Sequence, residues 1–143
     1  MLGGAKVGQR FGFGPRLIYL VGGQQDEDGE AISRVELYDP QAASWTQRAG
    51  MADPRSEHGC VALDGKLYAV GGFGANDQQL DTVEVYDLQT DGWQPLAKMT
   101  TRRWGLGLAA VGGKIYAIGG HDGDKALDSV EAYDPQLLSL IHI

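Results

Sequence analysis

The chain has 143 residues, of which 43% are hydrophobic and 22 are glycine, a composition that permits a packed core with many turns and disfavours disorder. Its 12 Lys and Arg against 19 Asp and Glu give a net charge of −7, which disfavours an electrostatic grip on nucleic acid or on an anionic membrane. We therefore expect protein partners, with no nucleic acid and no membrane.

The single cysteine, Cys60, excludes an internal disulfide framework and favours a reducing compartment. We interpret it as apolar filler of the core, with a reactive thiol as the alternative. No stretch approaches the roughly 20 consecutive apolar residues that span a bilayer, and the N-terminus lacks the apolar core of a secretory signal. We expect a cytoplasmic protein, with nuclear and cytoskeletal locations as alternatives. The basic residues before Asp26 also faintly fit a mitochondrial presequence.

An apolar run that ends in two glycines recurs three times, at residues 17–23, 67–72 and 115–120, and a Tyr-Asp pair follows each run. The tyrosines inside the runs, Tyr19, Tyr68 and Tyr116, are separated by 49 and 48 residues. A period near fifty is typical of a propeller blade. The sequence therefore predicts three related β units.

Each unit can be divided into four strands. Glycine-led apolar runs at residues 59–63 and 107–111 predict the first strand, and the tyrosine-containing run predicts the second. The turns between them, Asp64-Gly65 and Gly112-Gly113, tolerate positive φ and suit two-residue hairpins. The second strand is apolar throughout, so we expect neighbouring blades to cover both of its faces, and its glycine pair to let another backbone approach closely.

The third strand alternates with a period of two, so that Val83 and Val85 fall on one face and Glu84 and Tyr86 on the other. The turns that follow are Asp39-Pro40, Asp87-Leu88 and Asp134-Pro135, in which aspartate bonds back to the backbone. A tryptophan seven residues after the tyrosine predicts a fourth strand over residues 45–51 and 93–99, with Trp45 and Trp93 as packing anchors.

Leu140 takes the place of this tryptophan in the third unit. The last six residues look like the translation of a transposon end used in sequencing-library adaptors. We therefore expect residues 138–143 to be a non-native tail, and Met1 to be internal to a longer reading frame.

These residues resemble the kelch repeat, and residues 55–99 contain every element of that motif in order. The resemblance covers residues 17–136, and Val-Glu-x-Tyr-Asp followed by Trp is most similar to the kelch-like family, whose members pair a propeller with BTB and BACK domains. The fold that it implies is an all-β, kelch-type β-propeller, incomplete, with about three four-stranded blades at residues 15–51, 52–99 and 100–137. The motif residues are Gly22, Gly23, Tyr38, Trp45, Gly71, Gly72, Tyr86, Trp93, Gly119, Gly120 and Tyr133.

The resemblance implies a protein-interaction module. The first hypothesis is the substrate-recognition propeller of a cullin-RING ubiquitin ligase adaptor, which would reach a cullin only through a BTB domain that these residues do not include. The second is an actin-binding or cytoskeletal scaffold. Some kelch propellers are copper oxidases that use a modified tyrosine, but this sequence shows no histidine cluster to hold the metal. We therefore expect no enzyme activity and no cofactor.

In a four-stranded meander, the connection that enters the first strand and the connection that leaves the second strand must emerge on the same side. Those that leave the second strand, at residues 24–33, 73–82 and 121–129, are long, and long loops on a rigid scaffold carry recognition. Residues 52–58 and 100–104 reach the same side. The candidate contact residues are Arg55, Ser56, His58, Phe73, Arg102, Arg103, Trp104 and His121.

Arginine forks bind carboxylates and tryptophan offers an apolar anchor, so these residues predict recognition of an acidic peptide motif. The alternatives are that the arginines brace neighbouring acidic loops and that Phe73 packs against its own loop. Acidic residues on the loops would oppose a wholly acidic ligand; they are Asp26, Glu27, Asp28, Glu30, Asp122 and Asp124.

Three apparent motifs fail on spacing. Residues 59–66 have one residue too many for a phosphate loop and lack its Ser or Thr. Residues 26–29 lack the spaced ligands of a calcium loop. His58 and His121 have no dependable third ligand for a transition metal. We therefore predict no metal site.

Overall fold

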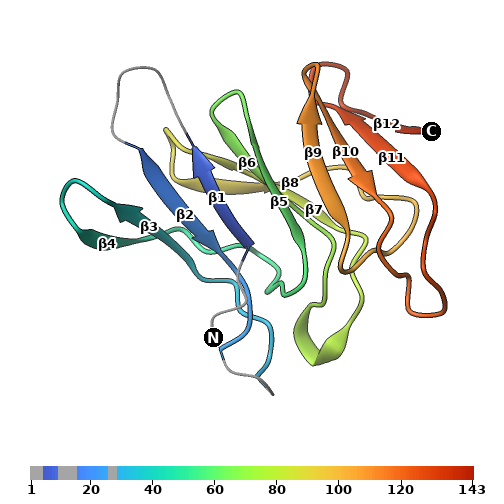
Figure 1. Ribbon diagram of the computed structural model, residues 1–143, viewed down its shortest axis with the longest axis horizontal. Helices are drawn as coiled ribbons and strands as arrows, with labels where there is room; N and C mark the ends of the chain where they lie inside the picture. The colour runs from blue at the N-terminus through green and yellow to red at the C-terminus, as the bar shows by residue number, and fades with distance from the viewer. Residues whose placement is uncertain (1–4, 10–15, 26–28) are drawn as a thin grey trace.

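The computed structural model describes residues 5–9, 16–25 and 29–143, with the backbone alone for residues 5–9. Three four-stranded antiparallel sheets lie side by side, and each follows the order of the chain (Figure 1). The first sheet contains β1 (Ala5–Gln9), β2 (Leu17–Val21), β3 (Val35–Asp39) and β4 (Ser44–Arg48). The second contains β5 (Gly59–Leu63), β6 (Lys66–Val70), β7 (Val83–Asp87) and β8 (Gly92–Pro95). The third contains β9 (Gly107–Val111), β10 (Lys114–Ile118), β11 (Val130–Asp134) and β12 (Ser139–His142).

The first strands of the three sheets are neighbours, since β5 contacts both β1 and β9. The sheets therefore fan out from one inner edge, as propeller blades do, and in the described residues they form an arc (Figure 1). The predicted all-β fold with three four-stranded blades is confirmed. A short 3-10 helix, Ala75–Asp77, lies between β6 and β7. Among the described residues, no helix has the length and apolar character needed to cross a membrane.

Two-residue hairpins join the first and second strands of the second and third sheets, as predicted. In the second sheet Leu63 pairs with Lys66, and the turn residues Asp64 and Gly65 have φ of 48° and 76°. Gly112 and Gly113 take φ of 59° and 77° between β9 and β10. Positive φ at both central positions is the requirement of the hairpin turn whose twist matches the flanking strands.

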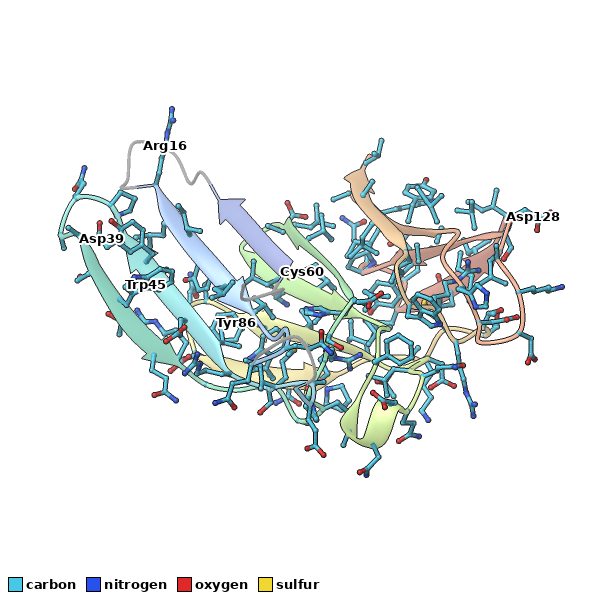
Figure 2. The ribbon with its side chains drawn as sticks, turned by 60° about the horizontal axis from the view of Figure 1, so that its bottom comes forward. Arg16, Asp39, Trp45, Cys60, Tyr86 and Asp128 are labelled. Atoms are coloured by element: carbon cyan, nitrogen blue, oxygen red, sulfur yellow. The ribbon has the colours of Figure 1, made fainter. Side chains whose placement is uncertain are left out.

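Apolar side chains fill the space between successive sheets. One cluster joins the first and second sheets: Tyr19, Val21, Val35, Leu37, Met51, Leu67, Ala69 and Tyr86. Two clusters join the second and third: Val70, Val83, Met99 and Ala117 in one, and Tyr68, Ile115 and Tyr133 in the other. Figure 2 shows Tyr86 inside the array, where its ring meets that of Tyr19 edge-on at 6.0 Å. The second strand of the central sheet, β6, is therefore covered on both faces, which explains its unbroken apolar sequence.

The glycine pair at the end of β6 admits the backbone of the next unit. Gly71 has φ of +63°, and a Cβ there would collide with the carbonyl oxygen of Arg103 and approach the Met99 methyl group at 3.1 Å. The N–H of Gly72 donates to the same Arg103 carbonyl at 2.7 Å. The predicted close approach of two backbones is therefore confirmed at this joint.

The fourth strands are shorter than predicted. β4 ends at Arg48 and β8 at Pro95, whereas the sequence analysis extended them to Met51 and Met99. The chain leaves the ladder because both methionines fold under the neighbouring sheet, where they are 5% and 4% exposed. A buried methionine marks packing between blades and not strand pairing.

Residues expected to form a non-native tail complete the third sheet. β12 pairs with β11, and Leu140 lies opposite Tyr133 as Trp93 lies opposite Tyr86. A leucine at this position therefore still allows the strand to form. The origin of residues 138–143 stays a prediction.

Candidate functional site

The long connections that leave the second strands gather at one end of the array, opposite the two-residue hairpins (Figure 1). The segments that enter β5 and β9 reach the same end, where Ser56 pairs with Phe73 and Trp104 with His121. Each long connection is also closed on itself by a bridge: Gln24 with Ala31, Phe73 with Gln79, and His121 with Ala126. We call this end the loop face; it comprises the described residues of 22–34, 52–58, 71–82, 100–106 and 119–129.

Trp104 lies between the rings of Phe73 and His121. Its ring centroid is 4.9 Å from that of Phe73 and 5.0 Å from that of His121, with interplanar angles of 33° and 35°. Backbone hydrogen bonds in both directions tie Trp104 to His121, and one unit earlier tie Ser56 to Phe73. All three rings are partly exposed. These three candidate residues, from two successive units, form what we call the aromatic stack.

Arg55 lies beneath the loop face with no exposed surface. Its guanidinium donates to the carbonyl oxygens of Gly71 and Thr82, at 3.0 and 2.9 Å, and to Glu84 Oε2 at 3.0 Å. Each of these partners belongs to the second sheet or to the connection between β6 and β7. Arg55 therefore ties the entry of β5 to its own blade.

Arg103 repeats this arrangement in the third unit and is likewise fully buried. Its guanidinium donates to the carbonyl oxygens of Gly119 and Ser129, at 2.9 and 3.0 Å, and to Glu131 Oε2 at 3.0 Å. The arginine and its glutamate are 28 residues apart here and 29 residues apart in the second unit. We call these two pairs the arginine–glutamate braces.

The glutamate of each brace also holds the backbone that precedes its arginine. Glu84 Oε1 accepts from the N–H of Ala52, and Glu131 Oε1 from that of Thr100, both at 2.7 Å. Burial alone would raise the pKa of Glu131, but hydrogen bonds from Thr100 and Arg103 outweigh it and hold the pKa below its ordinary value. Glu131 is therefore ionised at neutral pH, and its charge is compensated.

The burial of Arg55 and Arg103 corrects their expected role in ligand binding, because their guanidinium groups are occupied by partners within the chain. The bracing alternative describes them better, although the partners are strand glutamates and not acidic loops. Arg102 is exposed and remains a candidate contact. Glu84 and Glu131 were missed as functional residues of the joint; a charged side chain on a strand covered on both faces signals a buried partner.

Ser56 and His58 are also buried, at 3% and 8% exposure. Neither nitrogen of the His58 ring has a hydrogen-bond partner among the described residues. Burial, together with the positive charge of Arg55, lowers the pKa of His58 from 6.5 to about 4. His58 is therefore neutral at physiological pH and belongs to the packing beneath the loop face.

His58 should make the chain less stable in mild acid. Below pH 6.5 the unfolded chain binds a proton that the folded chain excludes, so the free energy of unfolding should fall by up to about 1.4 kcal/mol per pH unit until the folded pKa near 4 is reached. Above pH 6.5 both states are neutral and this contribution is constant. Denaturant melts between pH 7.5 and 4.5 measure the slope.

The repeat supplies a matched control for this titration. A side chain at Gly72 would meet His58, and one at Gly120 would meet Leu106, so leucine occupies the equivalent position in the third unit. The variant His58→Leu should therefore fold and should lose this part of the pH dependence. Parallel stability curves for the two proteins would contradict a buried, neutral His58.

The acidic loop residues fall into two groups. Asp26, Glu27 and Asp28 lie outside the described residues, while Glu30 is exposed. Asp122 caps its own turn: hydrogen bonds from the N–H groups of Lys125 and Asp124 to its Oδ1, both at 2.9 Å, lower its pKa. Asp122 directly follows His121 in the chain, so an acidic group lies next to the aromatic stack.

Two further predictions concern chemistry at cysteine and at metals. Cys60 is half-buried and packs against the cluster between the first and second sheets, and burial raises the pKa of its thiol to about 12. A thiol with that pKa is protonated at neutral pH, as expected of core filler. In the part of the chain that the structure describes, no three His, Cys, Asp or Glu side chains are grouped to hold a metal ion.

Comparison with known proteins agrees with this geometry. The KLHDC2/KLHL20/DRC7 Kelch-repeats domain matches residues 12–143. The chain belongs to the kelch-repeat family. Its fold is also that of the solved structure of YjhT, with a TM-score of 0.78 at 17% identity over 89% of this chain and 48% of that one. The kelch propeller expected from the repeat is therefore confirmed.

Curated relatives match this kelch-repeat chain over shorter segments. Rat kelch-like protein 7 is 43% identical over 44 residues, which cover 31% of this chain and 8% of that protein. Kelch repeat and BTB domain-containing protein 1 of cowpox virus (strain Brighton Red) is 33% identical over 64 residues, 45% of this chain and 11% of that protein. An F-box/kelch-repeat protein of Arabidopsis thaliana is 42% identical over 55 residues, 38% of this chain and 14% of that protein. The matched segments cover only 8–14% of the length of these relatives, and the similarity supports a protein-interaction module.

Proposed function

We propose that this kelch-repeat chain recognises protein substrates for a cullin-RING ubiquitin ligase, with the aromatic stack at the centre of its contact surface. Relatives named for both a BTB domain and kelch repeats support the adaptor role. Kelch-like proteins, which the Val-Glu-x-Tyr-Asp motif resembles, join the propeller to BTB and BACK domains. The proposed setting is the cytoplasm, in keeping with a single, unpaired cysteine.

The aromatic stack is the observation that carries the contact surface. Partly exposed aromatic rings held rigidly by backbone hydrogen bonds are the side chains that dominate binding energy at protein interfaces. The stack is also built from two successive units, so its geometry depends on how the second and third units pack together. A ligand segment with an apolar or aromatic side chain fits this surface.

Charge on the loop face selects the rest of the ligand. Arg102, two residues before Trp104, is exposed and can pair with a carboxylate of the ligand. Asp122 and Asp124 follow His121 in the sequence, and their negative charges disfavour a second acidic residue of the ligand near that ring. We propose a peptide with one acidic residue beside its apolar anchor, a narrower form of the expected acidic motif, because Arg55 and Arg103 are buried and Arg102 is exposed.

Removing the central ring should abolish most of the binding. Trp104→Ala in the complete protein is expected to weaken partner binding at least about 30-fold, the loss typical of an interface hot spot of about 2 kcal/mol. Trp45→Ala is the matched control, because Trp45 is 57% exposed and lies on β4, away from the loop face. Affinity capture from cells followed by titration of a recovered partner measures both variants.

Two outcomes would count against these proposals separately. Equal binding by Trp104→Ala and wild type would remove the aromatic stack from the contact surface. Failure to capture a cullin with a BTB-containing full-length protein would contradict the adaptor role, and co-sedimentation of that protein with actin filaments would favour the cytoskeletal scaffold.

A further inference from the structure

The brace of the second unit contains a second acid. Asp53 Oδ2 lies 3.5 Å from Arg55 Nη2 and accepts a hydrogen bond from the Thr82 hydroxyl at 3.0 Å. The Thr82 oxygen itself accepts from Arg55 Nη2 at 2.9 Å. Arg55 is therefore held between the buried carboxylate of Glu84 and an outer carboxylate that is 43% exposed.

The third unit repeats this arrangement with a threonine in place of the outer acid. Thr101 and Asp53 each lie two residues before the arginine of their brace. The residue before each of them donates its backbone N–H to the glutamate of the brace at 2.7 Å. The Arg103 guanidinium donates to the Ser129 hydroxyl oxygen at 2.9 Å, the distance found in the second unit. Among the described residues, the one ion-pair partner of Arg103 is Glu131. The third brace therefore keeps the partners of the outer acid but not the acid.

Two exposed basic side chains, Lys98 and Arg102, flank Thr101, whose own side chain is partly exposed. In the second brace the equivalent place receives one negative charge, from Asp53. A threonine phosphate carries a charge of about −1.5 to −2 and three acceptor oxygens, and it forms charge-assisted hydrogen bonds where it meets arginine. A phosphate on Thr101 would therefore supply the missing acid.

We propose that Thr101 is a phosphorylation site, and that its phosphate binds the Arg103 guanidinium and the Ser129 hydroxyl as the Asp53 carboxylate binds their equivalents. The phosphate donor is ATP bound to a protein kinase. The Thr101 hydroxyl oxygen attacks the γ-phosphorus, the new O–P bond forms as the bond to ADP breaks, and the hydroxyl proton passes to the catalytic base of the kinase. The products are ADP and a phosphomonoester on the chain.

The adjacent threonine has the opposite electrostatic setting. The Thr100 hydroxyl donates to Glu131 Oε1 at 2.9 Å. A phosphate on Thr100 would meet this carboxylate, which is 1% exposed, and like charges at that distance repel. The contrast favours Thr101 and makes Thr100 an internal control.

Phosphorylation would also change the charge of the loop face. Arg102 directly follows Thr101, and a neighbouring phosphate competes for its guanidinium. The acidic residue of the ligand then loses its partner, so we expect the modification to weaken ligand binding about 10-fold, the ratio for a lost charge-assisted hydrogen bond. This consequence rests on the proposed function, whereas the modification itself does not.

Site mapping is the first test. The chain is incubated with Mg²⁺, ATP and a cytosolic extract of cultured animal cells, and its phosphopeptides are sequenced by mass spectrometry. Phosphate should be found on Thr101 in the wild-type chain and in Thr100→Ala, and should be absent from this segment in Thr101→Val. A wild-type chain without phosphate on Thr101, or with phosphate on Thr100 in its place, would overturn the proposal.

Thermal unfolding tests the geometry without a kinase. Thr101→Asp restores the acid of the second brace and should raise the midpoint of unfolding by about 2–4 °C, the shift expected from a partly exposed ion pair. Thr101→Asn has a similar shape without the charge and should give no comparable rise. Thr100→Asp should lower the midpoint, because its carboxylate would face Glu131. A Thr101→Asp chain no more stable than Thr101→Asn would contradict the place proposed for the phosphate.

A synthetic peptide with one Phe and one Asp tests the effect on ligand binding. The chain phosphorylated at Thr101 should bind this peptide about 10-fold more weakly than the unmodified chain. Equal affinities of these two forms would refute the effect of the phosphate on the loop face. Equal affinities of the wild-type chain and Trp104→Ala would refute the proposed contact surface alone, since site mapping and unfolding use no ligand.

Discussion

Replacing Glu84 with glutamine is expected to lower the free energy of unfolding by about 3–5 kcal/mol, the cost typical of leaving one partner of a buried ion pair uncompensated. Arg55 would keep its bonds to the carbonyl oxygens of Gly71 and Thr82 but would lose the buried carboxylate 3.0 Å away. Asp53 is a poor substitute, because it lies 3.5 Å from Arg55 and its side chain is 43% exposed. Urea denaturation followed by circular dichroism measures the loss.

The same position in the first unit supplies the control. Glu36 pairs with Arg34 at 3.7 Å, and the two side chains are 26% and 49% exposed. A pair that is this open to solvent contributes little, so Glu36→Gln should cost less than about 1 kcal/mol. Equal losses at Glu36 and Glu84 would show that burial of the brace does not set its contribution.

Replacing Gly71 with alanine should destabilise the chain by about 2–5 kcal/mol. A left-handed backbone at φ +63° costs a side chain about 1–2 kcal/mol, and the collision of the new Cβ with the Arg103 carbonyl adds an overpacking cost of about 1–3 kcal/mol. The backbone of Arg103 cannot move away freely, because it also accepts the hydrogen bond from Gly72. Thermal and urea melts measure the effect.

A substitution at Gly119 is the control that distinguishes the cost of backbone strain from the cost of the collision at Gly71. Gly119 has nearly the same φ, +60°, but the nearest atom to an added Cβ is the carbonyl oxygen of Leu127 at 3.3 Å. Gly119→Ala should therefore cost only the strain, about 1–2 kcal/mol. A Gly119 variant as unstable as the Gly71 variant would contradict close approach as the reason for the glycine.

The first strands of the second and third sheets could be predicted to the residue because two signals mark their ends. The first strand of the first sheet, β1 (Ala5–Gln9), was not predicted, and it lies before residue 15, where the first unit was expected to begin. A glycine begins β5 and β9, and a dipeptide that accepts positive φ ends each of them. The fourth strands had no such signal at their ends. Met51 and Met99 are apolar and in phase with the strand, yet they face the joint between sheets, and a single sequence does not separate these two kinds of burial.

The candidate site was predicted at the level of loops and not of side chains. Phe73, Trp104 and His121 were placed on one face because the meander fixes which connections share an end, and the structure brings their rings together. The exposure of Arg55 and Arg103 could not be judged from the loops alone. It depends on the glutamates 29 and 28 residues later, whose carboxylates point back beneath the loop face.

The arginine–glutamate braces also bear on how such an array can grow. The side chain of Arg55 bonds within its own sheet, while its carbonyl accepts from the N–H of Gly23 in the preceding unit at 2.7 Å; Arg103 does the same towards Gly72. The side chain of one residue therefore stabilises its own unit, while the carbonyl of the same residue links that unit to the preceding one. Tandem duplication of a whole unit would copy that coupling intact, so a gene could lengthen by entire repeats without any compensating mutation.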